Sequence, residues 1–208
     1  FQIYVPWRLA KQFGGDDKVK EAFDYFTAKA KEAGFAGIEF QCQQDYLRNE
    51  NCAREFRKAG YTGAFTYNWL ELVVPFSSSY WPDFNNKPDK DYKEWGEEAF
   101  KSLSERAKQH PEYQYYPNVT CGWDTNARFP DNVYVPVAKN RSPELFEYFL
   151  RKAKDWADKN IKNGNPKLIV INALNEWTED SYIEPDEEFG YGYLNAIANV
   201  FGGNGQSK

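Results

Sequence analysis

The sequence lacks several residues and spacings that whole classes of site require. It has one histidine, His110, which excludes a histidine-based catalytic triad and a multi-histidine metal site within this chain. It has three cysteines, Cys42, Cys52 and Cys121, and no CxxC pair that would indicate a zinc or thioredoxin motif. We therefore predict no metal site and no cofactor. A Cys42–Cys52 disulfide is one alternative, and we favour three free thiols.

The sequence also lacks long apolar runs and an excess of basic charge. No run approaches the roughly 20 apolar residues that span a bilayer, so we predict no membrane insertion. A net charge of -5 argues against a nucleic-acid partner, whose binding surface is normally basic. Neither GxGxxG nor GxxxxGK[ST] occurs, so a Gly-rich phosphate loop is absent.

The beginning of the sequence has unusual features. It starts at Phe1, contains no methionine and shows no signal peptide. We interpret this as a missing natural amino terminus, and we expect roughly 100 or more residues before Phe1 in the natural protein, enough for the remaining units of a barrel.

Short apolar runs alternate with segments of helical period. Strands are expected at residues 1–6, 36–41, 62–67, 117–121 and 168–172. Helices are expected at 17–33, 47–59, 89–109, 142–163 and 190–201. The last strand is nearly all apolar, which is typical of a parallel strand covered on both faces. Such alternation predicts an α/β fold with a parallel sheet.

Two architectures suit this alternation, an open doubly wound sheet and a (β/α)8 barrel. Polar and aromatic residues gather after the expected strands, at 4–7, 41–45, 67–69, 123–124 and from 172 onward. Barrel enzymes place their chemistry at this end of the strands. We therefore prefer a TIM-type barrel, of which residues 1–208 form a single domain that holds the C-terminal five or so βα units.

Two glutamates, Glu176 and Glu179, follow the most apolar strand. Carboxylates three residues apart can face the same way on a helical turn. Glycoside hydrolysis commonly uses such a pair, with one carboxyl as proton donor and the other ionised. The alternative is that they belong to a solvated helix face, where this spacing is frequent. The surrounding Asn, Trp and Tyr residues favour a reaction centre.

The segment Asn175-Glu-Trp-Thr-Glu-Asp-Ser-Tyr-Ile-Glu-Pro-Asp186, with residues 189–190 and 193–197, resembles the signature of the WbsX-like proteins. These belong with the glycoside hydrolase family 99-like domains, related to endo-α-mannosidases and endo-α-mannanases. Residues 119–128 resemble the Trp-Asp-x-x-x-Arg stretch of that group, and residues 1–6 resemble its mid-barrel strand. Thr178 and Asp180 stand where the family 99 mannosidases have His and Gly, so the WbsX-like branch is the nearer match.

The resemblance implies a (β/α)8 barrel that cleaves glycans with retention of configuration. It implies that Glu176 deprotonates the sugar 2-hydroxyl, which attacks the anomeric carbon to form a 1,2-anhydro sugar. Glu179 is then the general acid, which later activates water. The resemblance also favours a periplasmic, cell-surface or secreted protein.

The remaining predicted site residues come from the same strand ends. Asn172 and Asn175 are expected to hold the catalytic loop and to contact the substrate. Asp124 and Arg128 are expected to bind sugar hydroxyls or, alternatively, to pair with each other. Each aromatic candidate stacks on sugar or, alternatively, packs the barrel rim. These candidates are Tyr67, Trp69, Trp123, Trp177 and Tyr182.

The leading hypothesis is a glycoside hydrolase whose partner is a polysaccharide or oligosaccharide substrate, with an α-mannoside as one candidate. One alternative is a glycosyltransferase of surface-polysaccharide synthesis, against which the lack of a DxD motif between strands counts. The other is a catalytically silent glycan-binding barrel, against which the retained glutamate pair counts. The oligomeric state is not predicted.

Overall fold

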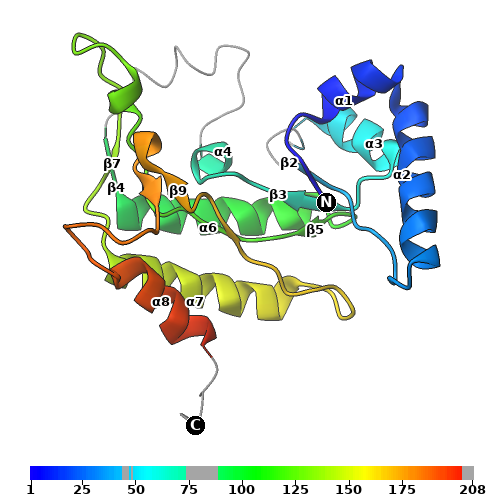
Figure 1. Cartoon of the computed structure of the whole chain (residues 1–208). Helices are drawn as coiled ribbons and strands as arrows, with labels where there is room; N and C mark the ends of the chain where they lie inside the picture. Colours follow the sequence, from blue (N-terminus) through cyan, green and yellow to red (C-terminus); the bar gives the residue numbers. More distant parts are fainter. Residues whose placement is uncertain (44–46, 48, 74–88, 203–208) are drawn as a thin grey trace. The chain divides into compact units, whose positions relative to one another are not determined.

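The computed structural model describes residues 1–43, 47, 49–73 and 89–202 (Figure 1). Contacts divide the chain into two compact units. The first unit comprises residues 1–66 and 103–116, and the second comprises residues 67–102 and 117–208. Within the described ranges, no helix combines the length and apolar character that crossing a membrane requires.

A parallel sheet forms the centre of the first unit, with strand order β1-β2-β3-β5. The strands are β1 (Gln2–Ile3), β2 (Gln41–Gln43), β3 (Gly63–Phe65) and β5 (Gln114–Tyr115). Cys42 pairs with Ile3 on one side and Ala64 on the other. The second strand was expected at 36–41 and lies instead at Gln41–Gln43, because its neighbours form a ladder with it only from Gln41 onward.

The helices of the first unit are α1 (Pro6–Phe13), α2 (Asp16–Glu32) and α3 (Glu50–Ala59). Helices α2 and α3 fall where the periodicity predicts them. Asn49 caps α3, since its side-chain oxygen accepts the amides of Asn51 and Cys52 at 2.9 and 3.2 Å. Helix α1 was not predicted, although Pro6 at its first turn and Gly14 with φ 88° at its end are ordinary helix signals.

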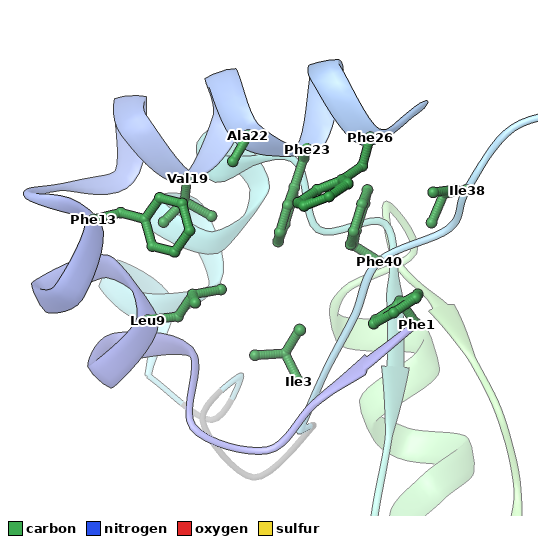
Figure 2. Close-up of a pocket in the computed structure, with 10 residues that line it drawn as sticks. All are labelled: Phe1, Ile3, Leu9, Phe13, Val19, Ala22, Phe23, Phe26, Ile38 and Phe40. Carbon is green, nitrogen blue, oxygen red and sulfur yellow. The ribbon is translucent and has the colours of Figure 1, made fainter. Parts of the chain in front are cut away.

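An apolar cavity of about 170 Å³ lies between α1, α2 and the adjoining strands (Figure 2). Only apolar side chains line it. They are Phe1, Ile3, Leu9, Phe13, Val19, Ala22, Phe23, Phe26, Ile38 and Phe40. Phe23 and Phe40 stack with their ring centroids 3.6 Å apart, so the wall of the cavity is continuous with the core of this unit.

The second unit contains short strand pairs and long helices. Strand β6 (Asn118–Val119) pairs with β8 (Val170–Ile171), and β4 (Lys90–Asp91) pairs with β7 (Ala138–Lys139), both in parallel. Three described α-helices lie entirely in this unit: α4 (Leu70–Val73), α7 (Pro143–Asn160) and α8 (Gly192–Phe201). Helix α6 (Tyr92–Gln109) begins in this unit and ends in the first.

The sequence explains the start of α7 and its packing. The Ser142 hydroxyl accepts the amide of Leu145 at 3.3 Å, and Pro143 occupies the first turn. Helix α7 packs along α8 (Figure 1), where Phe146 meets Tyr193 with ring centroids 5.2 Å apart. Phe146 is fully buried, which contributes about 2–3 kcal/mol to stability.

One strand departs from its expected environment. Residues 168–172 were expected to be buried on both faces, but Val170 and Ile171 are only half-buried and Leu168 is 38% exposed. Among the described residues this strand has a ladder with β6 alone, so one edge and part of its faces remain uncovered. The α/β class with parallel strands is confirmed, while the barrel stays a prediction.

All three cysteines are free, as we favoured. Burial raises the pKa of the Cys42 thiol to about 12, and it raises the pKa of the Cys121 thiol to about 12 as well. Since thiolates are the reactive form, both residues are inert packing residues.

Candidate active site

The glutamate pair lies on a tight hairpin in the second unit. Strand β9 (Asn175–Glu176) pairs antiparallel with β10 (Ser181–Tyr182), and the 3-10 turn η3 (Trp177–Glu179) connects them. The helical turn considered from the sequence is a single 3-10 turn here. Residues i and i+3 eclipse in a 3-10 turn, so both glutamates can still face one side.

One arginine joins the two carboxylates. Arg128 Nη1 donates to Glu179 Oε1 at 2.7 Å, and Arg128 Nη2 donates to Glu176 Oε1 at 2.8 Å. Its Nε donates to the Thr178 hydroxyl at 2.8 Å, and that hydroxyl donates to Glu176 Oε1 at 2.9 Å. The planar guanidinium therefore fixes the separation of the two acids.

Arg128 comes from a short 3-10 segment, η2 (Asn126–Arg128). Asp124 holds this segment, because its Oδ1 accepts the backbone amide and the side-chain amide of Asn126, both at 2.8 Å. The Asp124 backbone amide also donates to the Glu179 carbonyl at 2.8 Å. Asp124 and Arg128 are thus both beside the glutamates, although their side chains do not form the ion pair that we had considered with each other.

The two glutamates differ in environment. Glu179 is 8% exposed, and its second oxygen accepts a hydrogen bond from the Tyr67 hydroxyl at 2.5 Å. The Glu176 side chain is 41% exposed. Paired carboxylates in unequal surroundings are typical of acid–base sites, where one group exchanges protons with solvent and the other is shielded.

An aromatic pair stands next to the glutamates. Trp177 and Tyr182 stack with ring centroids 3.8 Å apart and an interplanar angle of 15°. Trp177 is 48% exposed, whereas Tyr182 is 7% exposed. The Trp177 indole donates to Glu184 at 2.7 Å, which fixes the ring in its plane. Trp177 thus offers an open face, and Tyr182 supports it from behind.

Three further predicted site residues are buried, as Glu179 and Tyr182 are. Trp69 has no exposed surface and donates its indole N–H to the Asn118 carbonyl at 2.9 Å, so it is a core residue in this structure. Trp123 is 7% exposed and lies edge-on to Tyr67, with centroids 6.5 Å apart. Asn172 is 8% exposed, and its side-chain oxygen accepts the Cys121 amide at 2.8 Å. This bond joins the residue after β8 to the segment that follows β6.

Two of these buried side chains carry a donor without a hydrogen-bond partner among the described residues. Trp123 Nε1 and Asn172 Nδ2 make no hydrogen bond within the part of the chain that the structure describes. Asn175, the remaining predicted residue, is exposed on β9. Buried donors are normally paired, so both positions suit contact with a polar ligand or water.

Sequence reasoning missed one residue that contacts this hairpin. Arg141 donates to both carboxylate oxygens of Asp180, at 2.6 and 2.5 Å. Its sequence neighbours form an ordinary helix start, so no local pattern marks it. Among the described residues, no group of three or more His, Cys, Asp or Glu side chains is placed to hold a metal ion.

Comparisons with known proteins identify the family. The chain has an α/β fold with parallel strands and an arginine-bridged glutamate pair at a hairpin. The model of the family described as Glycosyltransferase WbsX matches residues 11–197. The chain therefore belongs to the WbsX family.

Two curated relatives are similar over part of the chain. Each is described as uncharacterized protein WxcX, from two strains of Xanthomonas campestris pv. campestris, and each is 30% identical over 117 residues. That stretch is 55% of this chain and 15% of the relative. The chain thus corresponds to a small part of these longer proteins.

Two solved structures are similar to this chain. A glycoside hydrolase-like protein is 14% identical with a TM-score of 0.53, covering 88% of this chain and 49% of that chain. The GH99 endo-alpha-mannosidase from Bacteroides thetaiotaomicron, in complex with bis-tris propane, is 18% identical with a TM-score of 0.41, covering 78% and 45%. The first of these likenesses supports a shared fold only.

Proposed function

We propose that this chain carries the reaction centre of a retaining glycoside hydrolase that acts on a polysaccharide or oligosaccharide. The observation that supports it best is the arrangement of Glu176 and Glu179. One carboxylate is open to solvent, the other is buried, and Arg128 contacts both at 2.7–2.8 Å. A hydrolase of this kind needs two such groups within reach of one glycosidic bond.

In the proposed reaction, Glu176 removes the proton from the sugar 2-hydroxyl. The 2-oxygen attacks the anomeric carbon as the bond to the leaving group breaks, and Glu179 protonates the departing oxygen. The product of this step is a 1,2-anhydro sugar. Glu179 then takes a proton from water. The resulting hydroxide attacks the anomeric carbon and opens the three-membered anhydro ring, and Glu176 returns its proton to the 2-oxygen.

Arg128 constrains when this reaction can begin. A guanidinium that contacts both carboxylates stabilises negative charge on each of them. Glu179 must carry a proton to act as an acid, so the Arg128–Glu179 contact has to loosen when substrate arrives. The Arg128 side chain is 41% exposed, which leaves it room to move. Tyr67 keeps Glu179 in place during that movement, through its 2.5 Å hydrogen bond.

Other side chains provide contacts for a sugar. The open face of Trp177 suits stacking on a pyranose ring, because an indole combines a flat apolar surface with a polar edge. The unpaired N–H groups of Trp123 and Asn172 suit sugar hydroxyls. Trp69 is left out of this proposed site because its ring has no exposed surface.

The barrel forms part of the same proposal. We propose that residues 1–208 belong to one (β/α)8 catalytic domain, in support of which stand the parallel strands and a fold likeness that covers 49% of a longer chain. Strand β1 is at the edge of its sheet. In a closed barrel, β1 would pair with a further parallel strand. An experimental structure in which the free edge of β1 stays unpaired would contradict the barrel.

The proposed function is tested by isosteric substitution. Glu176→Gln and Glu179→Gln should each lower hydrolysis of a glycan that the wild-type protein cleaves by about 10²–10⁴-fold. Glu187→Gln is the matched control, because Glu187 is an exposed carboxylate further along the same segment. The substrate would be found by screening mannans and bacterial surface polysaccharides. Full activity of both site variants would refute the assignment.

A second candidate is a glycosyltransferase, which the description of the matching family favours. The same screen separates it from a hydrolase. Product that forms only when a sugar nucleotide is added would support transfer. Glycan binding without turnover, unchanged in both glutamine variants, would support a binding protein instead.

A further inference from the structure

Arg141 forms an ion pair that lies directly behind the glutamate turn. It precedes Ser142, the cap of α7, and its side chain is 10% exposed. Its Nε donates to Asp180 Oδ2 at 2.6 Å, and its Nη2 donates to Asp180 Oδ1 at 2.5 Å. Such a two-point contact fixes the orientation of the carboxylate as well as its distance.

Aromatic rings enclose this arginine. The guanidinium carbon is 5.1 Å from the Tyr182 ring centroid, 5.0 Å from that of Phe189 and 5.6 Å from that of Tyr193. It also donates to the hydroxyls of Tyr193 and Tyr182, at 2.8 and 3.0 Å. Although burial lowers the pKa of Arg141, Tyr193 and Asp180 raise it above its ordinary range. The arginine is thus charged and held on several sides.

Asp180 has a backbone conformation that few side chains adopt. Its φ of 53° and ψ of 29° are left-handed, and Asn140 is the one other described non-glycine residue with positive φ. Left-handed backbone is unfavourable for most residues other than glycine, and Asp and Asn are among the few that tolerate it. The Asp180 amide donates to the Trp177 carbonyl at 3.1 Å, which closes the turn.

The turn also packs closely against the adjoining loop. A Cβ placed on Gly122 would lie 2.4 Å from the Asp180 carbonyl oxygen and 2.7 Å from the Arg141 side chain. The Ser181 hydroxyl donates to the Gly122 carbonyl at 2.7 Å. Glu179 is the residue before Asp180, so the backbone conformation of this turn sets the direction in which the Glu179 side chain points.

We infer that Arg141 is a positioning residue for Glu179: by holding Asp180, it fixes the left-handed step that directs the Glu179 carboxylate toward Tyr67 and Arg128. The hydrogen bonds of the Arg141 side chain go to Asp180, Tyr182 and Tyr193, and none of these reaches Glu176 or Glu179. Its effect on turnover rests on the proposed function. Its effect on the placement of Glu179 does not.

The first test measures the placement of Glu179 directly. The side-chain carboxyl ¹³C resonance of Glu179, assigned by its loss in Glu179→Gln, should shift in Arg141→Met and shift less in Arg141→Lys. Arg151→Met is the control, because Arg151 pairs with Glu147 on α7 at 2.7 Å and its side chain is 56% exposed. The Glu179 resonance of Arg151→Met should coincide with that of the wild-type protein.

A second substitution guards against simple unfolding. Arg141→Met/Asp180→Gly removes both charges and places at position 180 the residue that adopts left-handed backbone freely. The Glu179 resonance of this double variant should lie closer to wild type than that of Arg141→Met. If Arg141→Met lowers the melting temperature and leaves the Glu179 resonance in place, the arginine is a structural residue only and the inference is overturned. If Arg141→Met does not fold, Arg141→Lys and the double variant decide by the same criterion.

Turnover gives the second readout. On a glycan that the wild-type protein cleaves, Arg141→Lys should lower kcat by about tenfold or more and change KM by less than about threefold, because a displaced proton donor slows chemistry more than binding. An unchanged kcat with a shifted resonance would overturn the link to catalysis. Absence of turnover in the wild-type protein would count against the proposed function, while the resonance would still decide the positioning role.

Discussion

Two arginines pair with carboxylates of the same short segment, and they differ in how much of each side chain is exposed to solvent. Arg128 is 41% exposed and contacts Glu176 and Glu179, whereas Arg141 is 10% exposed and contacts Asp180. An exposed ion pair contributes little to stability and can open, while a buried pair is costly to break. The difference indicates that the front of the turn can rearrange and that the back is fixed.

The largest expected effect is on stability, at the buried pair. Arg141→Met should lower the free energy of unfolding by about 3 kcal/mol, the low end of the range for breaking a buried pair, because the Asp180 side chain left without its partner is 27% exposed. Arg128→Met should lower it by less than about 1 kcal/mol. Urea unfolding of both variants measures the contrast. Equal losses would show that exposure does not divide the two pairs.

The next effect is on turnover, at the exposed pair. Arg128→Met should lower kcat/KM on a cleaved glycan by about 10²-fold, because the two carboxylates lose the group that sets their separation. The kcat/KM of Arg128→Lys should lie between those of the wild-type protein and Arg128→Met, since an ammonium cannot bridge both acids with the same geometry. Steady-state kinetics provide the measurement. Wild-type rates in Arg128→Met would remove this residue from the site.

A smaller effect is expected at the tyrosine that holds the buried acid. Tyr67→Phe removes a hydrogen bond to Glu179 and should lower the free energy of unfolding by about 1.5–3 kcal/mol, the usual range for a bond to a charged group. Tyr134→Phe is the comparison, because Tyr134 is exposed and its hydroxyl donates to Asp89. Thermal unfolding should show the smaller loss for Tyr134→Phe, and the reverse order would contradict the burial argument.

The smallest effect concerns pH. Contacts with Lys139 and Tyr134 lower the pKa of Asp89 from 3.8 to about 2. A lowered carboxyl pKa contributes stability above pH 3.8 that is lost as the pH falls toward 2. The contribution is about 1 kcal/mol, since this pair is near the surface. Unfolding between pH 6 and 2 should be less pH-dependent in Asp89→Asn, and identical profiles would contradict the origin of this shift.

The sequence was informative about which residues gather at the turn. Glu176, Glu179 and Tyr67 were singled out at expected strand ends, and Arg128 was singled out through the family resemblance. The structure brings the four side chains into one hydrogen-bonded cluster. Barrel enzymes gather polar residues at the carboxyl ends of their strands, and that rule points to this grouping without knowledge of the turn itself. Their roles in a reaction stay predictions.

Other features could not be read from local pattern. Trp69 follows a strand like the site residues, but its indole pairs with a backbone carbonyl in the core, which depends on tertiary packing. Arg141 lies 39 positions before Asp180, and a contact over that separation leaves no spacing to recognise. The left-handed Asp180 was equally hidden, because Asp is common in ordinary loops.

Gly122 carries no functional group, yet the turn leaves no volume for one at that position. Any engineered change there would act as a wedge between two loops and would disturb a reaction centre that the new side chain never touches. Screens that score residues by their chemical groups would overlook it. The architecture of this site therefore depends on the lack of a side chain at position 122 as much as on its two acids.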